Sequence, residues 1–347
     1  MLSNRVRRSL RCVGAILLLG SLAPLSGGCV AIRQEKAKAH ARRGDALLVK
    51  EELRAALAEF QEAAKLAPQL PTPHSRMGGI YRRLGEYEHA IGSFVEAIRR
   101  DPESFEDTFN LGQLYHLTKR VKDAIQAYLH AVELKPQDFD AQMNLGVCYQ
   151  HAGEIQQAAE RFERAITIDP GRPHAYVNLG VALDAQERYY DAVRAFKDAL
   201  ERDSRQPQVL VSLAQTYMNQ DRLKIARQAL HQALDLDPEL ATAHEALGYC
   251  LFRLREFQEA ENAYKSAIAL DRKLPRAHAG LGSVHMLRYL DDPTRTDQRD
   301  RALEQWHQSL EQNPDQPRIR KLIAQYSPGT NDPASSLIEA HAGTPNR

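Results

Sequence analysis

Three asparagines recur at a constant interval in the middle of the chain. Asn110, Asn144 and Asn178 are each 34 residues apart. An amide side chain both donates and accepts hydrogen bonds, so a row of amides suits the backbone of an extended peptide regardless of the peptide's sequence. The alternative is that each amide bonds only to its neighbours within the same chain. We interpret the three residues as a ladder in a peptide-binding groove.

Apolar residues accompany this ladder and continue beyond it. They are Met143, Val147, Val177, Val181, Val211, Met218, Tyr249 and Phe252. Contiguous exposed apolar surface usually marks an interface, and the flexible methionine side chain adapts to varied partners. The alternative is that curvature of the chain buries much of this stripe. We expect the stripe to line the same groove and to contact a protein or peptide partner.

The other side chains capable of chemistry favour structural roles. Metal ligands must converge on one ion, whereas four histidines occupy one position in separate copies of the 34-residue interval. These are His40, His74, His244 and His278. Cys148 and Cys250 lie three intervals apart, too far for a disulfide, and we expect both in the core. The sequence contains no glycine-rich phosphate loop, nucleophile elbow or metal motif. It therefore predicts a protein that is not an enzyme and needs no metal or cofactor.

A repeating unit of 34 residues must position these side chains. Prolines stand at Pro68, Pro102, Pro136, Pro170 and Pro238, with intervals of 34, 34, 34 and 68 residues. In the copy that ends at Pro170, the preceding pattern is Gly146, Tyr149, Ala158, Phe162 and Ala165, and it recurs in register in the other copies. This pattern resembles the tetratricopeptide repeat family, in which each repeat is a pair of helices.

The resemblance implies an all-α fold, a right-handed α-solenoid of eight helix pairs whose first helices line a concave groove. The eight repeats occupy 37–316 and start at 37, 71, 105, 139, 173, 207, 241 and 275. The last contains an insertion, 291–298, which we expect to loop out between its two helices. The amphipathic pattern of 317–326 predicts a helix that caps the array, and the polar composition of 327–347 predicts a flexible tail.

Glycine occupies the same place in the first helix of seven of the eight repeats. Glycine inside a helix costs about 0.5–1 kcal/mol relative to alanine, so its recurrence indicates that another group approaches closely there. We expect glycine on the first helix and alanine on the second to bring the two backbones together. Gly85 and Gly153 are predicted to adopt the left-handed conformation between paired helices.

The N-terminal segment differs from the repeats. Residues 1–28 combine four arginines, no acidic residue and a short apolar stretch, which is typical of an export signal. The segment ends in Leu-Ser-Gly-Gly-Cys, which resembles the lipobox of bacterial lipoproteins, except that Ser26 stands where the family usually has leucine. The resemblance implies that Cys29 carries a lipid, with 29–36 as a short tether of about 25 Å when extended. The alternatives are cleavage near Gly28 without lipid, and an uncleaved signal anchor.

These features together predict a non-catalytic scaffold in the cell envelope. Val30, rather than aspartate, follows Cys29, which by resemblance to enterobacterial sorting favours the outer membrane, with the repeats facing the periplasm. The net charge of +1 gives no indication of nucleic acid. Similar lipoproteins take part in pilus or secretion-system assembly. Two alternatives stay open: a substrate-recruiting subunit of a separately encoded enzyme complex, and a periplasmic chaperone.

Overall fold

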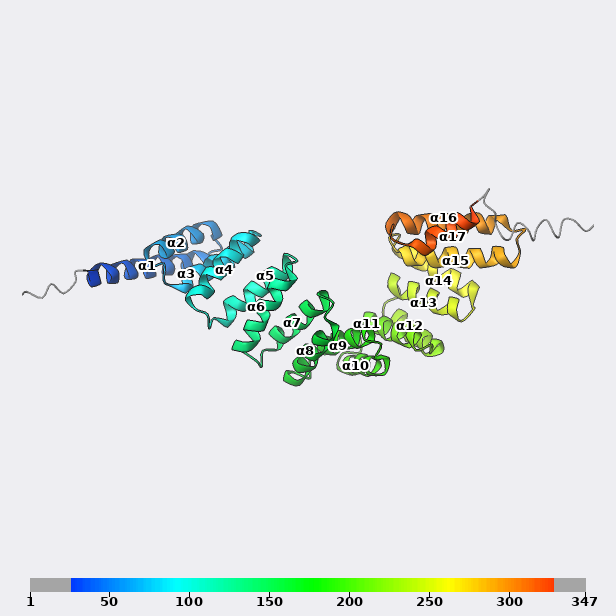
Figure 1. The fold of residues 1–347 in the computed structure, drawn as a ribbon, viewed down its shortest axis with the longest axis horizontal. Coiled ribbons are helices and arrows are strands. Elements are labelled where there is room, and N and C mark those ends of the chain that lie inside the picture. The colour runs from blue at the N-terminus through cyan, green and yellow to red at the C-terminus, as the bar shows by residue number, and fades with distance from the viewer. Residues whose placement is uncertain (1–25, 328–347) are drawn as a thin grey trace, which may run out of the picture. The chain divides into compact units, whose positions relative to one another are not determined.

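The structure is a computed structural model that describes residues 26–327, and all regular elements in this range are α-helices (Figure 1). The all-α prediction is therefore confirmed. The expected signal segment up to residue 25 and the expected tail from residue 328 lie outside the described residues. The helices are α1 (Ser26–Val49), α2 (Leu53–Leu66), α3 (Pro71–Arg83), α4 (Tyr87–Arg100), α5 (Phe105–Leu117), α6 (Val121–Leu134), α7 (Phe139–His151), α8 (Ile155–Ile168), α9 (Pro173–Ala185), α10 (Tyr189–Arg202), α11 (Pro207–Asn219), α12 (Leu223–Leu236), α13 (Ala241–Arg253), α14 (Phe257–Leu270), α15 (Pro275–Asp291), α16 (Thr296–Gln312) and α17 (Pro317–Tyr326).

The chain divides into two compact units, 1–107 and 108–347. In the first unit, α2 packs against both α1 and α3, and α4 packs against α3. In the second unit, each even-numbered helix from α8 to α14 packs against the two odd-numbered helices that flank it in sequence. The odd-numbered helices α7, α9, α11, α13 and α15 also contact one another in turn. The first helices of successive repeats therefore form one continuous layer within the second unit, as expected for a tetratricopeptide solenoid.

In the first seven repeats, the turn between paired helices contains one residue in the left-handed region. Gly85 and Gly153 have φ of 75° and 80°, which confirms the prediction made for them. Five other repeats have the same conformation without glycine, at Glu51, Lys119, Glu187, Asp221 and Arg255. A non-glycine residue with positive φ is strained by about 1 kcal/mol because its Cβ approaches its own carbonyl oxygen. The solenoid geometry thus overrides local preference at these turns.

The recurrent glycine of the first helix makes room for an aromatic ring. A Cβ placed on Gly146 would lie 2.6 Å from Cε1 of Phe162, and one on Gly180 would lie 2.7 Å from Cε1 of Phe196. The close neighbour is therefore a ring from the paired helix, and not the backbone contact that the sequence suggested. Repeat six has Ala214 at the glycine position and Leu230 at the ring position, and both are fully buried. Because the side chain of Leu230 is smaller than an aromatic ring, it leaves space for the methyl group of Ala214.

Two boundary predictions are wrong. Residues 29–36 are not an extended tether, because α1 runs from Ser26 to Val49 and includes them. At 1.5 Å per residue, this stretch rises only about 12 Å. The insertion 291–298 does not loop out as a whole either, because only 292–295 lie between the two helices. Instead α15 and α16 are each 17 residues long, against 13 and 14 for the corresponding helices of repeat seven.

The longer helices of repeat eight are stabilised by additional burial. Met286 and Tyr289, near the end of α15, join a core cluster with Trp306 of α16 and with Ile319 and Tyr326 of α17. The extra turn therefore gives α17 an apolar surface on which to pack. None of the helices within residues 26–327 is both long and apolar enough to cross a membrane.

Candidate groove in the C-terminal repeats

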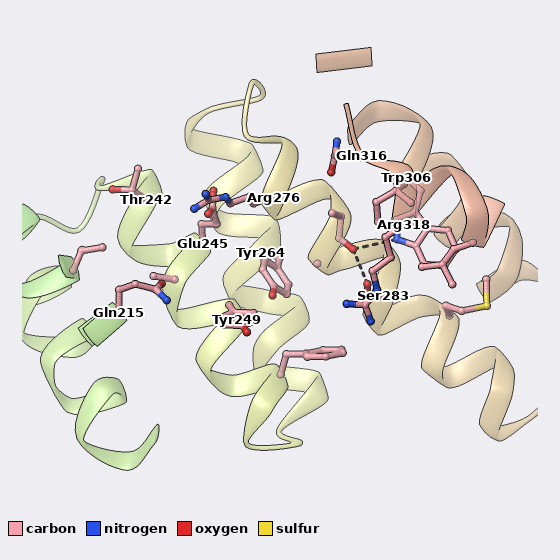
Figure 2. Close-up of a pocket in the computed structure, with 18 of the residues that line it drawn as sticks. Gln215, Thr242, Glu245, Tyr249, Tyr264, Arg276, Ser283, Trp306, Gln316 and Arg318 are labelled. Carbon is pink, nitrogen blue, oxygen red and sulfur yellow. Dashed lines mark hydrogen bonds between the residues drawn. The ribbon is translucent and has the colours of Figure 1, made fainter. Parts of the chain in front are cut away.

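The second unit contains a groove of about 1050 Å³. Its walls come from the layer of first helices, α9, α11, α13 and α15, and from α17 (Figure 2). Tyr249 of α13, Tyr264 of α14, Ser283 of α15 and Arg318 of α17 are among the residues that line it (Figure 2). The carbonyl of Ala279 holds two lining side chains in place, because it accepts hydrogen bonds from Ser283 Oγ at 2.9 Å and Trp306 Nε1 at 3.2 Å.

Half of the predicted apolar stripe lines this groove. Val181, Val211, Tyr249 and Phe252 are all lining residues, and Tyr249 is 44% exposed. Sequence reasoning did not find Leu287 and Leu290, which are 37% and 42% exposed and extend the apolar surface along α15. They lie near the end of that helix, just before the insertion 291–298.

The other half of the stripe does not form groove surface. Met143 and Met218 are only 6% and 0% exposed, so they belong to the core and our interpretation of them was wrong. Val147 and Val177 are partly buried against core clusters and do not line the groove. These four residues pack in or against the core clusters of the second unit, which is the burial that the alternative interpretation described.

The asparagine ladder ends where the groove begins. Asn110, Asn144 and Asn178 are half-buried on α5, α7 and α9, and none is a lining residue. The equivalent positions in the next three repeats are Ser212, Ala246 and Gly280, and all three line the groove. These small side chains leave the first helices uncovered, so the change from amide to small residue is a sequence signal that would have located the groove.

A glycine opens the centre of the groove. A Cβ on Gly280 would lie 2.2 Å from Cζ of Tyr264, which is itself a lining residue. Only glycine at this position allows the ring of Tyr264 to lie against α15. The groove floor is therefore built from a ring and a bare backbone, and a substitution at Gly280 would alter its shape directly.

Four charged residues line the groove. Asp184 accepts hydrogen bonds of 3.4 and 3.3 Å at its two carboxylate oxygens from the Asn219 amide. Burial raises the pKa of Glu245, and the neighbouring positive charge of Arg276 partly opposes that rise (Figure 2). Arg318 is exposed at the start of α17 and has no hydrogen-bond or ion-pair partner among the described residues. The groove is thus apolar with few charges, which suits binding rather than acid–base chemistry.

Residues considered for other chemistry lie elsewhere. Cys148 and Cys250 are fully buried, and burial raises the pKa of each thiol to about 11, so neither is a reactive thiolate at neutral pH. His278 bonds to the carbonyl of Arg272 and to the side chain of Gln305. Within residues 26–327, no group of three or more His, Cys, Asp or Glu side chains is arranged to hold a metal ion.

Comparison with known proteins decides the family. Residues 74–104 match the family model described as tetratricopeptide repeat. Residues 106–281, about half of the chain, match the model for the tetratricopeptide domain described as the cilia and flagella-associated protein 70 C-terminal domain. The chain belongs to the tetratricopeptide repeat family. Members bind other proteins, so this chain is a protein–protein interaction scaffold. No curated protein matches it.

Solved tetratricopeptide structures share this fold. A protein from Parabacteroides merdae is 14% identical with a TM-score of 0.61, covering 73% of this chain and 97% of its own. The C-terminal part of a protein from Cytophaga hutchinsonii is 21% identical with a TM-score of 0.57, covering 69% of this chain and 98% of its own. The APC/C hetero-tetramer Cut9–Hcn1 contains a chain that is 17% identical with a TM-score of 0.56. That match covers 82% of this chain and 55% of the other. At these identities the likeness extends to the fold alone.

Proposed function

We propose that this tetratricopeptide protein is a lipid-anchored scaffold of the bacterial envelope that captures a partner in the groove of repeats five to eight. The observation that carries the proposal is the concentration of exposed large apolar side chains in that groove. Val181, Tyr249, Leu287 and Leu290 are all exposed and all line it. Apolar patches of this kind on the surface of a folded array mark binding sites.

The membrane part of the proposal rests on the resemblance of the segment ending at Cys29 to a lipobox. Cys29 lies near the start of α1, which continues without interruption into the first repeat. A lipid on Cys29 would therefore connect to the repeats through a helix rather than a loose linker. We further propose an outer membrane location facing the periplasm, and a role in pilus or secretion-system assembly.

An affinity capture from detergent-solubilised envelope tests the groove. We expect Tyr249→Ala with Leu287→Ala to lose the partners of the wild-type protein while remaining folded. Tyr190→Ala is a matched control, because Tyr190 is an aromatic residue 80% exposed on α10, outside the groove.

A triple Asn110→Ala, Asn144→Ala, Asn178→Ala variant tests the ladder separately. Retention of every partner by the groove variant would refute the assignment. A transferase or protease among the partners would favour the substrate-recruiting alternative, and unfolded chains would favour a chaperone.

The anchor has its own test. Metabolic labelling with a fatty acid should label the wild-type protein but not Cys29→Ser, and the variant should leave the membrane fraction after a high-salt wash. If Cys29→Ser stays bound to the membrane and the wild type takes up no label, the anchor proposal is wrong. That result would leave the groove proposal untouched.

A further inference from the structure

The groove has the features of a site for a helix rather than for an extended strand. An extended peptide needs partners for its backbone N–H and C=O groups, whereas a helix satisfies them internally. Three of the hydroxyls that line the groove already donate within their own helix: Ser212, Thr216 and Ser283 each donate to the carbonyl four residues earlier. Such groups offer little to a peptide backbone, so an occupant that supplies its own backbone hydrogen bonds fits best.

The amide side chains of the groove are engaged in the same way. Gln215 donates to the side chain of Asn219 at 3.2 Å. Gln316 donates to the carbonyls of Ser309 and Asn313 at 3.0 and 2.8 Å, at the turn that precedes α17. This differs from the ladder of amides in repeats three to five, which suggested an extended ligand. The binding mode inferred from that ladder does not extend to the C-terminal groove.

Charge distinguishes one end of the groove from the other. Glu245 and Arg276 lie near each other on α13 and α15, so their charges offset one another (Figure 2). Asp184, on α9 at the far end, is held by the amide of Asn219. Arg318, on α17, has no carboxylate within ion-pair distance among the described residues. The α17 end therefore carries an uncompensated positive charge.

The surroundings of Arg318 favour a carboxylate as its partner. Leu322 lies one turn after Arg318 on α17 and lines the groove together with Leu287 and Leu290 of α15, so an apolar ligand surface bound against Leu322 would exclude water from the guanidinium. Arginine presents a planar fork of donors that matches a carboxylate, and removing water strengthens the attraction between them. When apolar contact with the ligand removes water from Arg318, an acidic side chain on the ligand would replace that water by forming an ion pair with the guanidinium.

We propose that the groove receives an amphipathic helix of the partner protein, with its apolar face against Tyr249, Leu287 and Leu290 and an acidic side chain paired with Arg318. This inference rests on the proposed function, because it assumes that the groove is the binding site. It assigns α17 a role beyond capping: the helix that closes the array also supplies the residue that selects the charge of the ligand.

Defined peptides test the proposal without knowledge of the natural partner. The probe is a fluorescein-labelled 18-residue helical peptide with leucines on one face and glutamates at one end. Its first matched form replaces each glutamate by glutamine, and its second contains a central proline that breaks the helix. Binding is measured by fluorescence anisotropy at 0.1 M salt and again at 0.5 M salt. The protein variants are Arg318→Gln and, as control, Lys321→Gln, which removes one positive charge from the exposed side of the same helix.

We expect the glutamate peptide to bind the wild type about tenfold more tightly than the glutamine peptide at low salt. Arg318→Gln should abolish that preference, Lys321→Gln should retain it, and the proline peptide should not bind. Equal binding of the two charge forms would overturn the role of Arg318. Equal binding of the proline form would overturn the helical occupant, and failure of every peptide to bind would overturn both. In each of these cases, loss of natural partners on Tyr249→Ala with Leu287→Ala would still support the groove as the binding site.

Discussion

Replacing Gly146 by alanine tests whether the recurrent glycine exists to admit an aromatic ring. The new Cβ would lie 2.6 Å from Cε1 of Phe162, where ordinary contact is 3.4–4 Å. Phe162 is fully buried, so its ring has no free space to enter. Overpacking of a core costs about 1–3 kcal/mol, whereas alanine is favoured over glycine within a helix by about 1 kcal/mol. We therefore expect a net loss of up to about 2 kcal/mol in the free energy of unfolding.

Repeat six shows which second substitution should relieve the clash. It has Ala214 and Leu230 at the two equivalent positions, both fully buried. Phe162→Leu alone should destabilise by about 1–1.5 kcal/mol, because it leaves unfilled space beside Gly146. Gly146→Ala combined with Phe162→Leu reproduces the pair of repeat six. The double variant should be more stable than the sum of the single effects predicts, with a coupling of at least about 1 kcal/mol.

Guanidinium chloride unfolding followed by circular dichroism measures the three free energies. Because a repeat array is stabilised by contacts between neighbours, hydrogen exchange in α7 and α8 should show where the loss occurs. Tyr190→Ala, at an exposed position, is the control for a substitution without packing consequences. The reasoning is refuted if the changes in free energy of unfolding of the two single variants add up to that of the double variant. It is also refuted if Gly146→Ala is more stable than the wild type by the full difference in helix propensity between alanine and glycine.

Three further predictions concern local strain and pH. Glu187→Gly should stabilise the protein by about 0.5–1 kcal/mol by removing a positive-φ penalty, and Gly85→Ala should destabilise it by about 1 kcal/mol, both measured by chemical unfolding. Burial lowers the pKa of His285 below 6.5, so the unfolded chain takes up its proton first. Stability should therefore fall as pH decreases below about 6.5, and His285→Asn should weaken that dependence. Burial opposes ionisation of Glu261, but hydrogen bonds from Lys265 and Arg288 prevail and lower its pKa. Its contribution should be complete above pH 4.5 and lost as pH falls below that value, and Glu261→Gln should cost up to about 3 kcal/mol at pH 7.

Each of these has a result that contradicts it. If Glu187→Gly does not stabilise the protein and Gly85→Ala does not destabilise it, positive φ is not strained in these turns. Identical slopes of stability against pH for the wild type and His285→Asn between pH 5 and 6.5 would show that this histidine is not buried in its neutral form. A Glu261→Gln variant as stable as the wild type would show that Lys265 and Arg288 are hydrated in the variant at no cost to the free energy of unfolding.

The sequence alone determined the repeat and hence the fold. The 34-residue interval of glycine, aromatic residue, alanine and proline specifies helix pairs, because each residue type has a local role that no other fold needs at that spacing. The left-handed turns at Gly85 and Gly153 followed from the same local reasoning. Half of the predicted apolar stripe, including Tyr249 and Phe252, lines the groove, since residues on one face of a helix follow from its periodicity.

Only the tertiary structure decided which apolar residues are exposed. Met143 and Met218 were assigned to the same stripe as Tyr249 and Phe252, but the methionines are buried in the core clusters of the stacked repeats, and the pattern of a single repeat does not report that burial. The lengthening of α15 and α16 was also hidden, because extra residues form a loop or an added turn according to what they pack against, here α17. The contribution of Arg318 to the groove likewise depends on how α17 packs against repeat eight. The direction in which a capping helix folds back depends on the surface it covers, and that surface exists only once the repeats have stacked.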